Sequence, residues 1–247
     1  MSMYWDQLTT KNFLEEIVGR VDTAILPVGS IEAHGQHCPL GTDNMAPAYF
    51  AAQLEKIYRD RILILPPVAY GYTPDLSVWP GSLSISASVL QQYVQEIGQG
   101  VAKWGINNLI LLNGHGGNIG ALQAAMDAIV QEPVRVVMIN WWLDYSTQIL
   151  TITRGQGHAG EDETSVMLKV APEWVRMEHA SFNPFRPRYR IKGPGISDKR
   201  LRNATTGDGR SATKEKGEKI VELIMKELGV LLERLWNDDL FERTDNG

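Results

Sequence analysis

The centre of the chain reads Asn108-Leu-Ile-Leu-Leu-Asn-Gly-His-Gly-Gly117, an apolar run that stops at a glycine-rich turn carrying a histidine. A short apolar run bounded by turn residues is typical of a strand buried on both faces. Three other runs share this character: Thr23–Val28, Ile62–Leu65 and Val134–Ile139. The sequence therefore predicts four strands of a buried sheet.

Longer segments with helical spacing of their apolar residues alternate with these strands or follow them. They cover residues 46–58, 86–104, 119–130, 160–170 and 212–236. Alternation of strands and helices predicts a mainly parallel sheet with helices on both faces. We therefore expect an α/β fold, a three-layer α/β/α sandwich, in which residues 1–247 form a single domain.

The composition limits the kinds of molecule that the chain is expected to bind. The chain has 247 residues and a formal net charge of -5, so it lacks the basic field that nucleic acid or an anionic membrane surface would need. A small-molecule substrate is the better expectation. Cys38 is the single cysteine and rules out an internal disulfide, and no apolar segment approaches the ~20 residues of a membrane span. We expect a cytoplasmic protein.

Four of the five histidines lie in short glycine-containing segments next to predicted elements: His34, His37, His115 and His158. The carboxyl ends of parallel strands meet at one edge of a sheet, so the segments 30–37 and 113–118 should project into the same crevice. Glu32 and His34 are two residues apart, and in extended backbone such side chains point to the same side.

Carboxylates accompany these histidines. Asp43 comes just before the helix expected from Ala46, where it can reach a cation and bridge two ions. His158 and Glu161 share a helix face if that helix begins early enough, and Glu163 would then point elsewhere. Carboxylates and imidazoles without a thiolate cluster suit Zn, Mn or Fe in an open site. Two such ions can activate a bridging water, which indicates hydrolysis.

Each feature also has a structural interpretation. In that interpretation, Glu161 is simply a favourable charge at the positive end of the helix dipole, and His37 is a hydrogen-bonding residue that lies outside the ligand set. Trp79 and Trp142 can wall a pocket or simply pack. The arginines at positions 186, 188 and 190 can be surface residues, or they can meet an anionic substrate or a neighbouring subunit. They belong to the segment 182–208, which is rich in Pro, Gly and Arg and is expected to form a lid, an interface or a site wall.

Taken together, the motifs resemble the creatininase (creatinine amidohydrolase) family over most of the chain. The matching segments are Leu26–Glu32, Glu32-Ala-His34 through Asp43, Trp79–Leu83, Asn113–Asn118, His158–Ser165 and Gly207–Gly217. The resemblance implies an α/β/α sandwich with two divalent ions per chain, and a homo-oligomer, often a hexamer. The chain departs from the family in Asp75–Trp79, which lacks a histidine that many relatives carry there.

The resemblance also implies roles for single residues. Glu32 and His115 would bind one ion, His34 the other, and Asp43 would bridge the two. Creatininase has a glutamate at the position of Gly117, and the resemblance implies that Glu161 supplies the missing carboxylate. His158 is expected to transfer a proton or to stabilise an oxyanion.

The resulting prediction is a dinuclear metal-dependent amidohydrolase that cleaves a carbon–nitrogen bond of a small cyclic amide or formamide through a metal-bridging hydroxide. Zn is the first choice of metal, with Mn or Fe as alternatives. A ring hydrolase of a keto-cyclitol or lactone is one alternative function. A catalytically silent binding or assembly protein of the same fold is the other.

Overall fold

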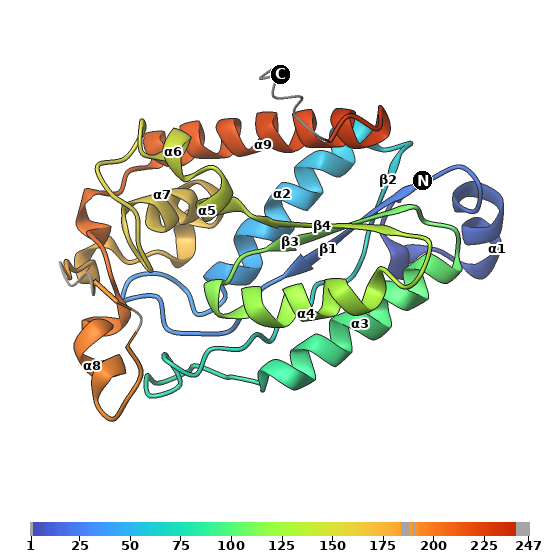
Figure 1. The fold of residues 1–247 in the computed structure, drawn as a ribbon. Coiled ribbons are helices and arrows are strands. Elements are labelled where there is room, and N and C mark those ends of the chain that lie inside the picture. The colour runs from blue at the N-terminus through green and yellow to red at the C-terminus, as the bar shows by residue number, and fades with distance from the viewer. Residues whose placement is uncertain (1, 184–187, 190, 241–247) are drawn as a thin grey trace, which may run out of the picture.

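A computed structural model describes residues 2–183, 188–189 and 191–240 (Figure 1). At its centre lies a parallel sheet with the strand order β2-β1-β3-β4. The strands are β1 (Thr23–Val28), β2 (Ile62–Ile64), β3 (Asn108–Asn113) and β4 (Arg135–Asn140). This confirms the predicted parallel α/β sheet, with strand ends shifted by one residue at most.

Helices cover both faces of this sheet. They are α1 (Thr10–Asn12), α2 (Thr42–Tyr58), α3 (Ala87–Lys103), α4 (Ile119–Ile129), α5 (Trp141–Asp144), α6 (Ser146–Ile149), α7 (Glu161–Val170), α8 (Ile196–Arg200) and α9 (Lys214–Trp236). Short 3₁₀ or π turns lie at Trp5–Gln7, Phe13–Ile17, Gly116–Asn118, Pro172–Trp174, Met177–His179, Arg202–Ala204 and Gly209–Ser211. Within the described ranges, no helix is both long enough and apolar enough to cross a membrane.

Alternate residues of each strand build two separate cores. Leu26 of β1 and Leu111 of β3 pack with α3 and α4 on one face. Ile25 and Ile110, one position earlier, pack with α2 and α9 on the other face (Figure 1). Because successive side chains of a strand point to opposite faces, continuous apolar strands of this kind require cover on both sides.

The strand order places a crevice between β1 and β3. The chain leaves β1 through α2 on one face of the sheet, whereas α3 and α4 lie on the opposite face (Figure 1). β1 pairs with both β2 and β3, so the chain changes direction along the sheet at β1. Ligands of open α/β sheets bind at such a switch point, outside the carboxyl ends of the strands.

We expect Leu111→Ala to lower the free energy of unfolding by about 2–5 kcal/mol, because the fully buried side chain leaves a cavity in the core. Leu14→Ala is the matched control, since Leu14 is 55% exposed and its truncation should change stability by less than about 0.5 kcal/mol. Urea unfolding followed by circular dichroism measures both. Equal effects of the two substitutions would contradict the layer assignment.

Candidate metal centre

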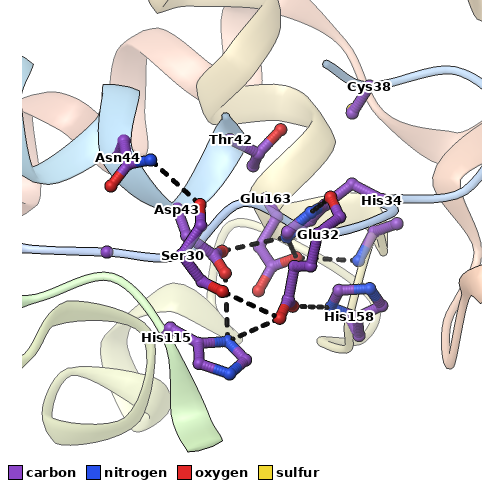
Figure 2. Close-up of polar contacts among 12 residues, drawn as sticks. Ser30, Glu32, His34, Cys38, Thr42, Asp43, Asn44, His115, His158 and Glu163 are labelled. Atoms are coloured by element: carbon purple, nitrogen blue, oxygen red, sulfur yellow. Dashed lines mark hydrogen bonds and ion pairs between the residues drawn. The ribbon is translucent and has the colours of Figure 1, made fainter. Parts of the chain in front are cut away.

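Three carboxylates and three imidazoles meet at the carboxyl ends of β1 and β3 (Figure 2). Glu32 and His34 follow β1, and His115 follows β3. Asp43 comes from α2, and the remaining two side chains, His158 and Glu163, come from the turn before α7 and from its first turn. All but His158 are buried, and the side chain of His158 is 17% exposed.

Asp43 is the centre of this cluster. Its Oδ1 lies 2.9 Å from Nε2 of His34, and its Oδ2 lies 3.0 Å from Nδ1 of His115. The two oxygens of one carboxylate therefore face two different imidazoles. Asp43 lies inside the first turn of α2, because that helix begins at Thr42, four residues earlier than predicted.

This geometry is possible because the backbone at the end of β3 lies very close to the backbone at the start of α2. A Cβ atom on Gly114 would overlap the backbone carbonyl of Asp43, so only glycine lets the end of β3 lie directly against the start of α2. Pro47 lies against the same point and has no N–H to donate to that carbonyl. His115, the next residue after Gly114, is thereby held beside Asp43.

Glu32 and Glu163 complete the ring of carboxylates. Oε2 of Glu32 lies 3.2 Å from Nδ1 of His115, and its Oε1 lies 3.6 Å from Nδ1 of His158. Oε2 of Glu163 lies 3.7 Å from Nε2 of His34. The same Glu163 oxygen accepts a 2.7 Å hydrogen bond from the backbone N–H of Ala159, which fixes the carboxylate in place.

Each of the three imidazoles is oriented by a backbone carbonyl. Nδ1 of His34 donates to Glu32 O at 3.1 Å, Nε2 of His115 to Tyr72 O at 3.1 Å, and Nε2 of His158 to Ala33 O at 2.7 Å. A carbonyl oxygen only accepts, so these nitrogens carry the proton. In the neutral rings the other nitrogen then presents a lone pair toward the carboxylates. A proton on that nitrogen, or a metal cation between the two groups, relieves this contact.

The pKa values show that the cluster attracts positive charge. Burial disfavours a charged His34, but the carboxylates of Asp43 and Glu163 outweigh burial and raise its pKa to about 10. Burial also opposes charge on His115, yet Glu32 and Asp43 raise its pKa well above the usual range. For Glu163, burial dominates and raises the pKa to about 8, with His34 acting in the opposite direction.

The residues present fit a pair of divalent cations. Glu32 Oε1, His34 Nε2 and Asp43 Oδ2 are buried and have no hydrogen-bond partner among the described residues. Such atoms are costly to bury unless something else satisfies them. Two sets have ligand atoms within 4.8 Å of one another, Glu32 with Asp43 and His115, and Glu32 with His34 and His158.

The structure does not bring Glu161 to this cluster, contrary to the expectation from the sequence. Its Oε1 lies 2.6 Å from Nζ of Lys216 on α9, and its Oε2 accepts a hydrogen bond from the backbone N–H of Arg154 at 2.9 Å. The expectation required the helix to include His158, but α7 begins only at Glu161. Two positions along a helix differ by about 200°, so Glu163 faces the histidines while Glu161 faces α9.

No signal in the sequence distinguishes the two glutamates, because both lie in the same buried first turn of α7. The structure does explain why the carboxylate is absent at position 117. A side chain there would overlap the carbonyl of Tyr72 and the ring of His115. That carbonyl orients His115, so Gly117 preserves the orientation of the imidazole.

A cleft of about 1200 Å³ opens over the cluster. Glu32, Asp43 and Glu163 line it, together with Trp142. Trp79 instead packs against a small apolar cluster at the edge of the fold. Part of the segment 182–208 forms a wall of the cleft, as one of the alternatives predicted, and Arg188 belongs to this wall. Arg186 and Arg190 lie outside the described residues.

Comparison with known proteins identifies the family to which the chain belongs. A sequence model of the creatininase family, described as creatinine amidohydrolase, matches residues 6–232. The chain therefore belongs to the creatininase family, whose named members are hydrolases.

Two relatives and one solved structure show how similar the chain is to individual members. It is 32% identical over 212 residues to the mycofactocin precursor peptide peptidase of Mycolicibacterium smegmatis, covering 81% of this chain and 80% of the relative. It is 26% identical to the creatinine amidohydrolase of Pseudomonas putida, covering 91% and 94%. A solved structure titled as Mn creatininase superposes with a TM-score of 0.85 at 24% identity, covering 95% and 98%.

His37 and Cys38 lie beside the cluster without joining it. Nε2 of His37 lies 2.9 Å from Oγ1 of Thr164, and the Cys38 thiol contacts the same hydroxyl. Burial raises the pKa of Cys38 to about 12, which excludes a reactive thiolate. Burial, reinforced by the charge of His34, lowers the pKa of His37 to about 4.

We expect His37 to make the fold sensitive to acid. Its pKa is about 4 in the folded chain and about 6.5 when unfolded, so the unfolded state binds the extra proton first. The stabilisation is complete above pH 6.5 and is lost as the pH falls to about 4, by about 3 kcal/mol at most. Denaturant unfolding across this range should show a shallower pH dependence for His37→Asn.

His179→Asn is the control, because His179 is exposed and should leave the pH dependence of unfolding unchanged. Parallel curves for wild type and His37→Asn would show that His37 does not carry the acid sensitivity.

Proposed function

We propose that the chain is a dinuclear metal-dependent hydrolase of an amide carbon–nitrogen bond. The observation that carries this proposal is the placement of Asp43, whose two oxygens face two imidazoles that are each held by a backbone carbonyl. A carboxylate in that position would be able to hold two divalent cations. Membership of a family with a named amidohydrolase supports the same reaction class.

The proposed ligand sets share Asp43. Glu32 and His115 would complete the first set, and His34 and Glu163 the second. His158, which lies close to Glu32 and His34, is assigned to proton transfer instead. Zn fits these nitrogen and oxygen ligands best, with Mn or Fe as alternatives, and one similar structure is titled with Mn. Bound there, two divalent ions would polarise the scissile carbonyl and lower the pKa of a shared water.

His158 is positioned to receive a proton. Its Nε2 is held by Ala33 O, so Nδ1 faces the cluster and the cleft with its lone pair. Burial lowers the pKa of His158 to about 4, with the positive charge of His34 adding to the shift. A neutral imidazole in this orientation accepts a proton at Nδ1 and returns it to the leaving nitrogen.

The substrate expected from the sequence, a small cyclic amide or formamide, stays a prediction, as do the cytoplasmic location and the homo-oligomer, a hexamer by resemblance. The alternative ring hydrolase of a keto-cyclitol or lactone would use the same ligands and the same proton acceptor. Assaying the metal-loaded protein on a panel of cyclic amides, formamides and lactones separates these functions. Metal binding without turnover of any member would favour the silent binding protein.

Asp43→Ala should remove both metal ions, because the lost carboxylate belongs to both ligand sets. Elemental analysis of protein purified with Zn and Mn measures the metal content per chain. Asp127→Ala, on the exposed side of α4, is the control and should retain the wild-type content. Two ions retained by Asp43→Ala would refute the bridging role.

Glu163→Gln and Glu161→Gln should have opposite phenotypes. Glu163→Gln should weaken the binding of one of the two ions, because an uncharged amide replaces a carboxylate that lies 3.7 Å from Nε2 of His34. Glu161→Gln should keep both ions and lower the melting temperature, because Lys216 loses its buried partner. Metal titration and thermal melts on the same preparations measure this, and the reverse pattern would return the ligand role to Glu161.

His158→Asn should retain two ions and lower turnover of any hydrolysed panel member by about 10²–10⁴-fold, the usual contribution of positioned proton transfer. Metal content and turnover are measured together. Loss of one ion would make His158 a ligand, and near-normal turnover in the metal-loaded variant would exclude it from the reaction.

A further inference from the structure

One wall of the cleft is strongly cationic in an otherwise acidic chain. Four basic side chains line it: Arg188, Lys192, Lys199 and Arg200. Outside the metal cluster, Asp75 is the single acidic residue among the described lining residues. The whole chain has a net charge of -5, so this concentration of positive charge is local.

Asp75 accounts for only two of these cations. It forms ion pairs with Lys192 and with Arg200, and it accepts a hydrogen bond from Ser197. These contacts tie the segment that carries α8 to the loop after β2.

Lys199 and Arg188 have no acidic partner among the described residues. Both are exposed to the cleft, and Arg188 lies with its guanidinium carbon 5.4 Å from the centre of the Tyr189 ring. Unpaired cations lining the same cleft as a reactive centre favour a ligand with negative charge. An arginine and a lysine that line one cleft suit a carboxylate or a phosphate group.

The size of the cleft argues in the same direction. Small-molecule sites usually enclose about 300–1,000 Å³. The cleft holds about 1200 Å³ and also has apolar lining residues, among them Leu76, Trp142 and Ile196. A small cyclic amide at the cluster would leave most of this volume to water.

We propose that the substrate is an extended amide whose non-reacting end carries a carboxylate or phosphate group, bound by Lys199 and Arg188. The scissile bond lies at the cluster and the anionic end at the cationic wall. This inference rests on the proposed hydrolase function and names the class of substrate. Asp75 is the positioning residue that holds Lys192 and Arg200 in the same wall.

Matched pairs of hydroxamic acids test the proposal on metal-loaded protein. The hydroxamate binds divalent ions, and the far end of an alkyl chain carries a carboxylate, a phosphonate or a neutral carboxamide, in a series of chain lengths. Isothermal titration should show that at one chain length an anionic end tightens binding about tenfold over the carboxamide, which corresponds to about 1.4 kcal/mol. Two exposed ion pairs can supply this, and added salt should reduce it.

The double variant Lys199→Gln/Arg188→Gln should abolish the preference while retaining the metal content and the affinity for the carboxamide probe. Lys219→Gln/Arg20→Gln is the control, because it removes two exposed positive charges outside the cleft and should keep the preference. A larger effect for the phosphonate assigns a phosphate-bearing substrate, and a larger effect for the carboxylate assigns a carboxylate-bearing one.

The outcomes separate this inference from the proposed function. Equal affinities for all three ends at every chain length would overturn the anionic subsite and leave the metal hydrolase intact. Protein that binds neither metal nor hydroxamate would refute the dinuclear function. In that case the affinity of a simple dicarboxylate, suberate, decides the inference: weaker binding by the double variant supports it, and unchanged binding overturns it.

Discussion

Mutual repulsion among three buried carboxylates is the constraint on which the rest of the site depends. Glu32, Asp43 and Glu163 lie within the same small volume, shielded from water. A neutral imidazole does not offset that charge, because its one proton is donated to a backbone carbonyl, so the carboxylates raise the pKa values of His34 and His115 and the site attracts positive charge. Divalent cations satisfy both groups at once, since they accept electron pairs from carboxylate and imidazole alike. Without such a cation the cluster is costly as an ordinary buried polar network, which supports the proposed metal centre.

The sheet supplies the rigidity that this arrangement needs. Loops after β1 and β3 diverge at the switch point, and backbone from both ends comes close to the start of α2 (Figure 1). Gly114 permits the contact with Asp43, and Gly117 leaves room for the carbonyl that orients His115. Backbone carbonyls of the loops that follow β1 and β2 thus orient the imidazoles.

The proposed reaction and the proposed substrate recognition use different parts of the chain. Most of the candidate metal centre lies at the ends of β1 and β3 and in α2, elements that belong to the core of the fold. The cationic wall comes from residues 188–189 and 191–201, which contact the loop after β2 through Asp75. Segments of this kind change in sequence more freely than strands do. A family can therefore keep one chemistry while its members accept different substrates.

The apolar runs and the glycine-histidine turns were sufficient to predict the parallel sheet and the convergence of Glu32, His34 and His115, because strand periodicity and the edge where strands end are local properties of a sequence. Local sequence properties do not determine whether Glu161 or Glu163 faces the histidines. Both occupy the first turn of α7, and which one faces the histidines depends on where the helix begins and on Lys216, 55 residues away in sequence. The phase of a helix against its neighbours is set by tertiary packing, so only the folded chain decides it.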